Sequence, residues 1–227
     1  MSSFRRAIEL GAHAVELDVQ PTSDGHPVVF HDAFLDRTTN GIGPMFQTPL
    51  DAVRQLDAGS WYDPSFAGER VPLLSEVLAL PNVEFEIELK GYGAAFLDAV
   101  LGAVEKAGVL ARVEFTGWNL LLLSLLKRRE PNARVGLFSS PAAPWMTADI
   151  FEHHIVGVAS TSGADVAHVH AGSLTRGIVE RLHALGLRVH ANDAATALDV
   201  RHAHNCGADR LSTNDIALAA REMAASL

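Results

Sequence analysis

Two short runs rich in strand-forming residues lie close together near the start of the chain, at Val15–Val19, where apolar and acidic residues alternate, and at Val28–His31. The eight residues between them include proline, glycine, serine and aspartate, which favour turns. A parallel crossover requires a dozen or more residues, so the two runs are predicted to pair as an antiparallel hairpin. Side chains alternate faces along a strand, so Glu16 and Asp18 are expected on one face and the apolar residues of the first run on the other.

Hydrophobic periodicity predicts a helix before this hairpin, at residues 2–10, and a long irregular segment after it, from Ala33 to Pro72, with a short helical patch near Pro49–Leu56. Strand and helix patterns then alternate regularly along the rest of the chain. The predicted strands are Val83–Lys90, Val113–Gly117, Arg134–Phe138, Asp165–His170, Arg188–Asn192 and Arg210–Thr213, and the predicted helices are Ala94–Lys106, Leu120–Arg129, Ala148–His154, Thr175–Leu185, Ala195–Asn205 and one from Asp215 to the end. Strands separated by helices indicate βαβ units and a parallel sheet.

This alternation favours an α/β fold, and specifically a TIM-type (β/α)8 barrel. Seven strands remain when the antiparallel arm Val28–His31 is set aside, whereas a closed barrel needs eight. Because the chain opens on a helix, the strand that is lacking is predicted to be the first one. An open barrel has exposed strand edges, so pairing with a second copy as a homo-oligomer is one expected arrangement.

Composition narrows the class of protein. A chain of 227 residues is expected to form a single domain over residues 1–227. No run of eighteen uncharged apolar residues is present, which excludes a membrane-spanning helix, and the N-terminus has no signal-peptide pattern, so a cytoplasmic location is expected. The net charge of −9 argues against a nucleic-acid partner, and the single cysteine, Cys206, excludes an internal disulfide and a thiolate zinc site.

The candidate chemistry lies on two predicted strands. Two acids on one strand face are costly to bury without a cation, so Glu16 and Asp18 indicate a site for a divalent metal, although a solvated strand face would give the same pattern. In the strand Val83–Lys90, the apolar residues alternate with charged ones, and in a barrel the charged set points inward. Glu88 and Lys90 then lie near the C-terminal ends of the strands, where barrel active sites form, and Glu86 lies deeper as a supporting residue.

These residues suit phosphate chemistry. Glu16, Asp18 and Glu88 supply carboxylate oxygens of the kind that Mg²⁺ and Ca²⁺ prefer, and a lysine beside the metal fits a phosphate group. His31, in the same hairpin as the first two acids, is a candidate to protonate a leaving alkoxide because imidazole titrates near neutral pH.

In several motifs along the chain, the sequence resembles the glycerophosphodiester phosphodiesterase family. The resemblance covers nearly the full chain and rests on GAHAVELDVQPTSDGHPVVFHD (11–32), LDRTTNG (35–41), VPLLSEVL (71–78), EIELK (86–90) and, more weakly, GADRLSTND (207–215). It implies a TIM-type barrel that hydrolyses glycerophosphodiesters from deacylated phospholipids to glycerol phosphate and an alcohol, a reaction of lipid and glycerol metabolism. It also implies that residues 32–72 form a small insertion near the active-site mouth, after the second barrel strand. The implied roles are metal binding for Glu16, Asp18 and Glu88, phosphate contact for Lys90, and catalysis for His31, as one of two catalytic histidines.

The family normally begins with a strand that carries His-Arg-Gly, and this sequence has no counterpart to it. One acid–base group is typically worth about 10²–10⁴ in rate, so the chain as written is expected to be a poor catalyst. Two explanations stay open, namely a start site assigned too late or a truncated product with an open barrel.

Two other functions are also open. The first is a barrel that binds a phosphodiester without turning it over. The second is a metal hydrolase built on His168, His170 and His190, which superficially suit zinc.

Overall fold

The computed structural model describes residues 1–225. Its residues form two compact units, of which the first comprises Met1–Phe115 and Arg128–Ala133 and the second comprises Thr116–Lys127 and the chain from Arg134 onward. The described elements, in chain order, are α1 (Ser2–Glu9), β1 (Ala14–Pro21), β2 (Pro27–Val29), η1 (Met45–Gln47), α2 (Leu50–Val53), η2 (Pro64–Phe66), α3 (Leu74–Leu78), β3 (Glu84–Leu89), α4 (Gly93–Ala107), η3 (Leu110–Arg112), β4 (Val113–Gly117), α5 (Leu120–Arg129), β5 (Arg134–Phe138), α6 (Ala148–Ser162), β6 (Val166–His170), η4 (Ala171–Ser173), α7 (Arg176–Ala184), β7 (Arg188–Asn192), α8 (Ala197–Cys206), β8 (Arg210–Leu211) and α9 (Ile216–Ala225). The predicted alternation of strands and helices is confirmed.

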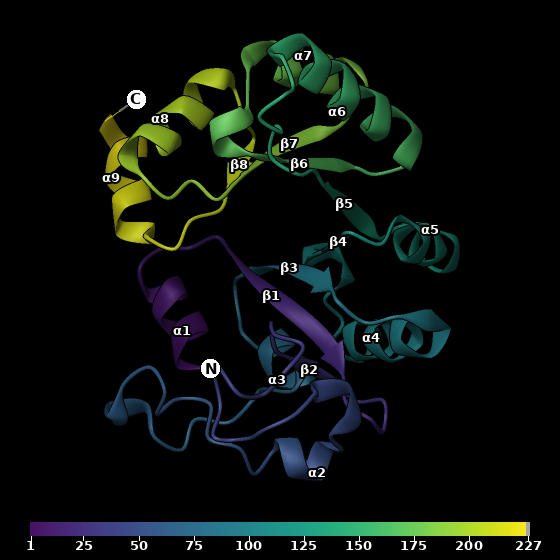
Figure 1. The fold of residues 1–227 in the computed structure, drawn as a ribbon, viewed down its shortest axis with the longest axis vertical. Helices are drawn as coiled ribbons and strands as arrows, with labels where there is room; N and C mark the ends of the chain where they lie inside the picture. The colour runs from purple at the N-terminus through teal and green to yellow at the C-terminus, as the bar shows by residue number, and fades with distance from the viewer. Residues whose placement is uncertain (226–227) are drawn as a thin grey trace. The chain divides into compact units, whose positions relative to one another are not determined.

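In the first unit, β1 lies between β2 and β3 (Figure 1). The predicted hairpin is confirmed, because β1 and β2 pair antiparallel with Val19 opposite Val29. Strand β3 pairs with β1 in parallel, which places Asp18 opposite Glu88. The parallel partner of β1 therefore comes from a segment about seventy residues later in the chain.

The predicted irregular segment has a small hydrophobic core of its own. Its buried side chains and two of the hairpin form one cluster, which comprises Val28, Phe30, Leu35, Met45, Val53 and Val71. Arg54, which follows α2 in the middle of the segment, joins it to α3 because its guanidinium donates two hydrogen bonds to the Glu76 carboxylate, both 2.7 Å long. The segment after His31 is thus anchored to the hairpin by packing and to α3 by an ion pair.

In the second unit, strands β5, β6, β7 and β8 form a parallel sheet in chain order, accompanied by α6 to α9 (Figure 1). The apolar residues of these strands and helices form one core cluster, with Val169, Val189 and Leu182 fully buried. This is the arrangement expected of consecutive βαβ units.

Several predicted boundaries differ from the structure. Helix α6 does not end at His154 but continues to Ser162, because Ile155 and Ala159 extend its buried face until Gly163 takes a left-handed conformation with φ 71°. Strand β2 ends at Val29 and does not include His31. The last predicted helix is present as α9, and residues 226–227 of that prediction lie outside the described residues.

A short helix, α3, was not predicted for the stretch Leu74–Leu78. Among the residues that the structure describes, no helix combines the length and the apolar character needed to cross a bilayer.

Candidate functional site

Strand periodicity places the two acids of β1 as expected. Val15, Leu17 and Val19 are buried, with at most 5% of their surface exposed, so Glu16 and Asp18 lie on the opposite face. The parallel register adds Glu88 from β3 directly beside Asp18, and Glu86 beside Glu16. Glu86 is buried, in agreement with its predicted deeper position.

The structure brings the three predicted metal ligands together. Glu16, Asp18 and Glu88 each offer a carboxylate oxygen, and these oxygens all lie within 4.8 Å of one another. The Lys90 Nζ atom lies 3.1 Å from Asp18 Oδ1 and 3.0 Å from Glu88 Oε1. One ammonium group thus bridges two of the three carboxylates, which leaves the cluster with an excess of negative charge.

The pKa values of the clustered side chains reflect this excess of negative charge. Burial and the Asp18 carboxylate raise the pKa of Glu16 from 4.5 to about 8. Burial also raises the pKa of Glu88 despite the hydrogen bond from Lys90. Burial opposes the charged form of Lys90, but Asp18 and Glu88 outweigh it and raise the pKa of the lysine. Solvent still reaches the Glu16 side chain, so a cation can enter the cluster.

The residues fit a hard divalent cation. Three carboxylates with a partly exposed opening form the oxygen-rich, negatively charged set that Mg²⁺ and Ca²⁺ bind, with water and ligand oxygens completing the shell. A bound divalent cation would remove the penalty that raises the pKa of Glu16. The roles of Glu16, Asp18 and Glu88 as metal ligands stay a prediction.

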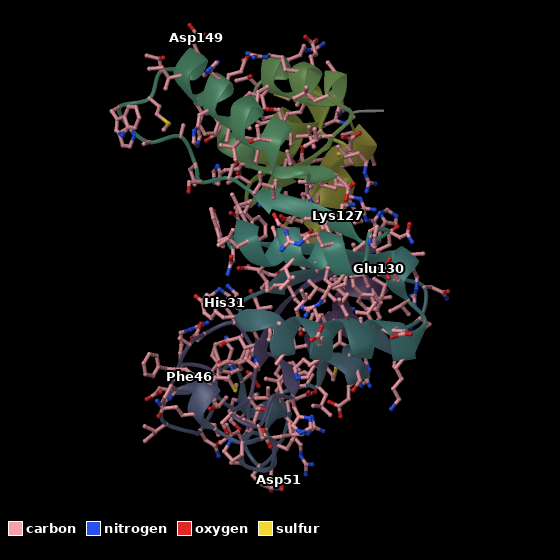
Figure 2. All side chains as sticks on the ribbon, turned by 90° about the vertical axis from the view of Figure 1, so that its right-hand side faces the viewer. His31, Phe46, Asp51, Lys127, Glu130 and Asp149 are labelled. Carbon is pink, nitrogen blue, oxygen red and sulfur yellow. The ribbon has the colours of Figure 1, made fainter. Side chains whose placement is uncertain are left out.

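His31 follows the end of β2, the antiparallel neighbour of β1. Its side chain is 64% exposed, and its Nδ1 atom lies 2.7 Å from Asp32 Oδ1. Arg37 pairs with the same Asp32 carboxylate. Figure 2 shows His31 at the edge of its unit.

Three neighbours of His31 were not identified from the sequence. Asp32 and Arg37 fall inside the motifs quoted above, and the adjacent His-Asp pair was the available signal. Gln20 gave no such signal, because only the folded hairpin brings its side chain to the backbone of residues 30–32.

The histidines of the alternative metal hydrolase lie in the second unit. His168 on β6 and His190 on β7 are opposite each other in the sheet, and their rings lie 4.4 Å apart between centroids. Burial lowers the pKa of His190. His170 Nδ1 accepts a hydrogen bond from the Gly172 backbone N–H at 3.2 Å, which gives this histidine a capping role.

Comparison with known proteins gives the family. The profile described as "Glycerophosphoryl diester phosphodiesterase family" matches residues 1–218. A glycerophosphodiester phosphodiesterase from Caldanaerobacter subterraneus subsp. tengcongensis is 36% identical over 157 residues, which cover 65% of this chain and 64% of that protein. The chain thus spans less than two thirds of the length of the curated relatives that it matches here.

Solved structures agree. The crystal structure of a glycerophosphodiester phosphodiesterase from Agrobacterium tumefaciens is 25% identical, with a TM-score of 0.80 over 96% of this chain and 90% of that one. An Oleispira antarctica phosphodiesterase, solved with the product sn-glycerol-3-phosphate, is 24% identical, with a TM-score of 0.82 over 98% of this chain and 90% of that one. These neighbours are TIM-barrel proteins, so the predicted fold class is confirmed. The chain belongs to the glycerophosphoryl diester phosphodiesterase family, whose members are phosphoric diester hydrolases.

Proposed function

We propose that this protein is a metal-dependent phosphodiesterase that hydrolyses glycerophosphodiesters to glycerol phosphate and an alcohol. The observation that carries the proposal is the convergence of Glu16, Asp18 and Glu88 within 4.8 Å, with the Lys90 ammonium beside them. The family match and the glycerol phosphate bound to the Oleispira antarctica relative support this substrate class. The family profile runs through both units to residue 218, which supports our further proposal that they act as one catalytic domain.

Each side chain has a chemical task in this proposal. Glu16, Asp18 and Glu88 would hold Mg²⁺ or Ca²⁺, which when bound would polarise phosphoryl oxygens and favour ionisation of the attacking oxygen. Lys90 presents a positive charge from the same face and would stabilise the negative charge that develops on the phosphoryl group. His31 would transfer a proton, as the acid for the leaving alkoxide or as the base for the attacking group.

The phosphate end of the substrate defines the proposed class. A cationic lysine beside a metal-binding carboxylate cluster suits a phosphodiester monoanion better than a neutral ester. Glycerophosphodiesters are the products of phospholipid deacylation, so this activity would belong to lipid and glycerol metabolism.

The decisive assay measures glycerol phosphate release from glycerophosphocholine with Mg²⁺ or Ca²⁺. The expected result is release that requires the divalent cation and falls about 10²- to 10⁴-fold in His31→Ala. Asp51→Asn is the matched control, because Asp51 is an exposed acid of the same unit that lies far from His31 in Figure 2. Binding of glycerophosphocholine without any release would instead indicate a binding protein.

A further inference from the structure

The exposed imidazole of His31 makes one side-chain contact, with Asp32, a residue that has no task in the proposed reaction. His31 is 64% exposed, so packing does not fix its ring, whereas its partner Asp32 is only 20% exposed. The distance of 2.7 Å between His31 Nδ1 and Asp32 Oδ1 is that of a strong, charge-assisted hydrogen bond. An ionised carboxylate only accepts hydrogen bonds, so the proton of a neutral imidazole must reside on Nδ1.

The Asp32 carboxylate is itself fixed. Arg37 Nε lies 2.5 Å from Asp32 Oδ2, and an Arg37 terminal nitrogen lies 2.8 Å from Oδ1. Such a two-point pair restricts the plane of the carboxylate as well as its position. The hydrogen bond from Arg37 holds the pKa of Asp32 down at about 2, so the carboxylate stays ionised under neutral and mildly acidic conditions.

The backbone that carries His31 is held independently. The buried Gln20 amide nitrogen lies 2.8 Å from the Phe30 oxygen, 3.0 Å from the His31 oxygen and 2.8 Å from the Asp32 oxygen. All three partners are carbonyl groups that only accept, so the nitrogen end of the Gln20 amide must face them. This side chain shares its two hydrogens among three carbonyl groups and clamps the turn that follows β2.

We propose that Asp32 is a positioning residue for His31: held by Arg37, it accepts the Nδ1–H hydrogen bond and so keeps Nε2 free to take up or give the catalytic proton. The inference rests on the function proposed above, because it assigns a partner to the histidine of that reaction. Asp32 does not touch the substrate in this role. It fixes which ring nitrogen carries the proton and which direction the other one faces.

The first test observes the imidazole directly. Nitrogen NMR of the full chain, at a pH where the neutral imidazole prevails, reports which ring nitrogen is protonated, and the His31 signals are those absent from the His31→Ala spectrum. The expected result is protonation at Nδ1 in the unaltered protein and a mixture of the two tautomers in Asp32→Asn. Protonation of the unaltered protein at Nε2, or an unchanged tautomer in Asp32→Asn, would overturn the proposal.

The second test is kinetic, with glycerophosphocholine and the divalent cation. In serine proteases the equivalent change costs about 10⁴ in kcat. At the more exposed His31 we expect Asp32→Asn to lower kcat about 10- to 100-fold with little change in KM, while Asp51→Asn keeps full activity. A change in KM alone, or an equal loss in the Asp51 control, would contradict the positioning role. If the unaltered protein released no glycerol phosphate, the proposed function would fail, and the tautomer measurement would still decide what Asp32 does.

Discussion

The carboxylate cluster leads to a prediction in which one substitution has opposite effects with and without metal. The change is Glu16→Gln, which keeps the shape of the side chain and removes its charge. In the metal-free protein the Asp18 and Glu88 carboxylates face Glu16 within 4.8 Å, so removing one charge relieves repulsion. With a divalent cation present, the same change removes one of its oxygen anions.

The magnitude follows from the pKa of Glu16, which rises from 4.5 to about 8 on folding. At 1.36 kcal/mol per pKa unit, keeping this group ionised in the folded protein costs about 5 kcal/mol. Solvent reaches the side chain and screens the repulsion, so we reduce this to about 1–2 kcal/mol. For a chain of this size, that corresponds to about 2–8 °C in Tm.

The sign depends on pH. Between about pH 4.5 and pH 8 the folded protein holds a proton on Glu16 that the unfolded chain releases, so the folded state loses stability as the pH rises through this window. Glu16→Gln removes that loss. With a chelator present, we therefore expect the variant to melt about 2–8 °C above the unaltered protein near pH 8 and at the same temperature near pH 4.5.

Thermal unfolding with a chelator and then with Mg²⁺ or Ca²⁺ measures both effects. At one hundred times its dissociation constant, a cation stabilises the folded protein by about 2.7 kcal/mol, and the variant should gain clearly less than this. Glu9→Gln is the matched control, because Glu9 is 64% exposed on α1 in a surface pair with Arg6. A chelated Glu16→Gln protein that melts below the unaltered protein near pH 8, or a full metal response in the variant, would refute the account of the cluster.

Three further predictions concern single residues. His31→Ala should lose activity but keep the full rise in Tm on addition of the divalent cation, because His31 is not a proposed metal ligand. A smaller rise in Tm would indicate that His31 contributes to metal binding. Lys90→Met removes the ammonium that lies 3.1 Å from Asp18. With a chelator present, Tm should therefore fall by about 2–6 °C, and an unchanged Tm would contradict the ion pair with Asp18. In the assay with the divalent cation, KM for glycerophosphocholine should rise. Gly59→Ala would place a methyl group 1.9 Å from the Phe66 backbone oxygen, so urea unfolding should show a loss of about 1–3 kcal/mol in the free energy of unfolding. The control is Gly102→Ala on α4, whose methyl group meets nothing within 4 Å and should not lower the stability.

Local sequence patterns determined the elements and the faces of the strands. The hairpin followed from a link of eight residues, and the shared face of Glu16 and Asp18 followed from the two-residue period of a strand. The strands Val113–Gly117, Arg134–Phe138 and Arg188–Asn192 have the predicted bounds. The predicted end of α6 was too early, because two polar histidines in the middle of the helix interrupt the apolar pattern, although the buried face continues to Ala159.

The candidate ligands were also predicted from the sequence, from the period of two strands and from the quoted motifs. The predicted barrel fold also led us to expect that the three carboxylates lie close together. Their convergence depends on the register that puts Asp18 beside Glu88, seventy positions away along the chain.

The tertiary structure alone decided which side chains surround these residues. Strand alternation placed Lys90 near Glu88, but only the fold shows that its ammonium bridges Glu88 and Asp18. The contact of Arg37 with Asp32 and that of Gln20 with the backbone after β2 do not follow from spacing. The physical reason is that periodicity is a property of neighbouring residues, whereas a hydrogen bond or an ion pair requires two groups to meet within about 3 Å, which only the packed fold arranges.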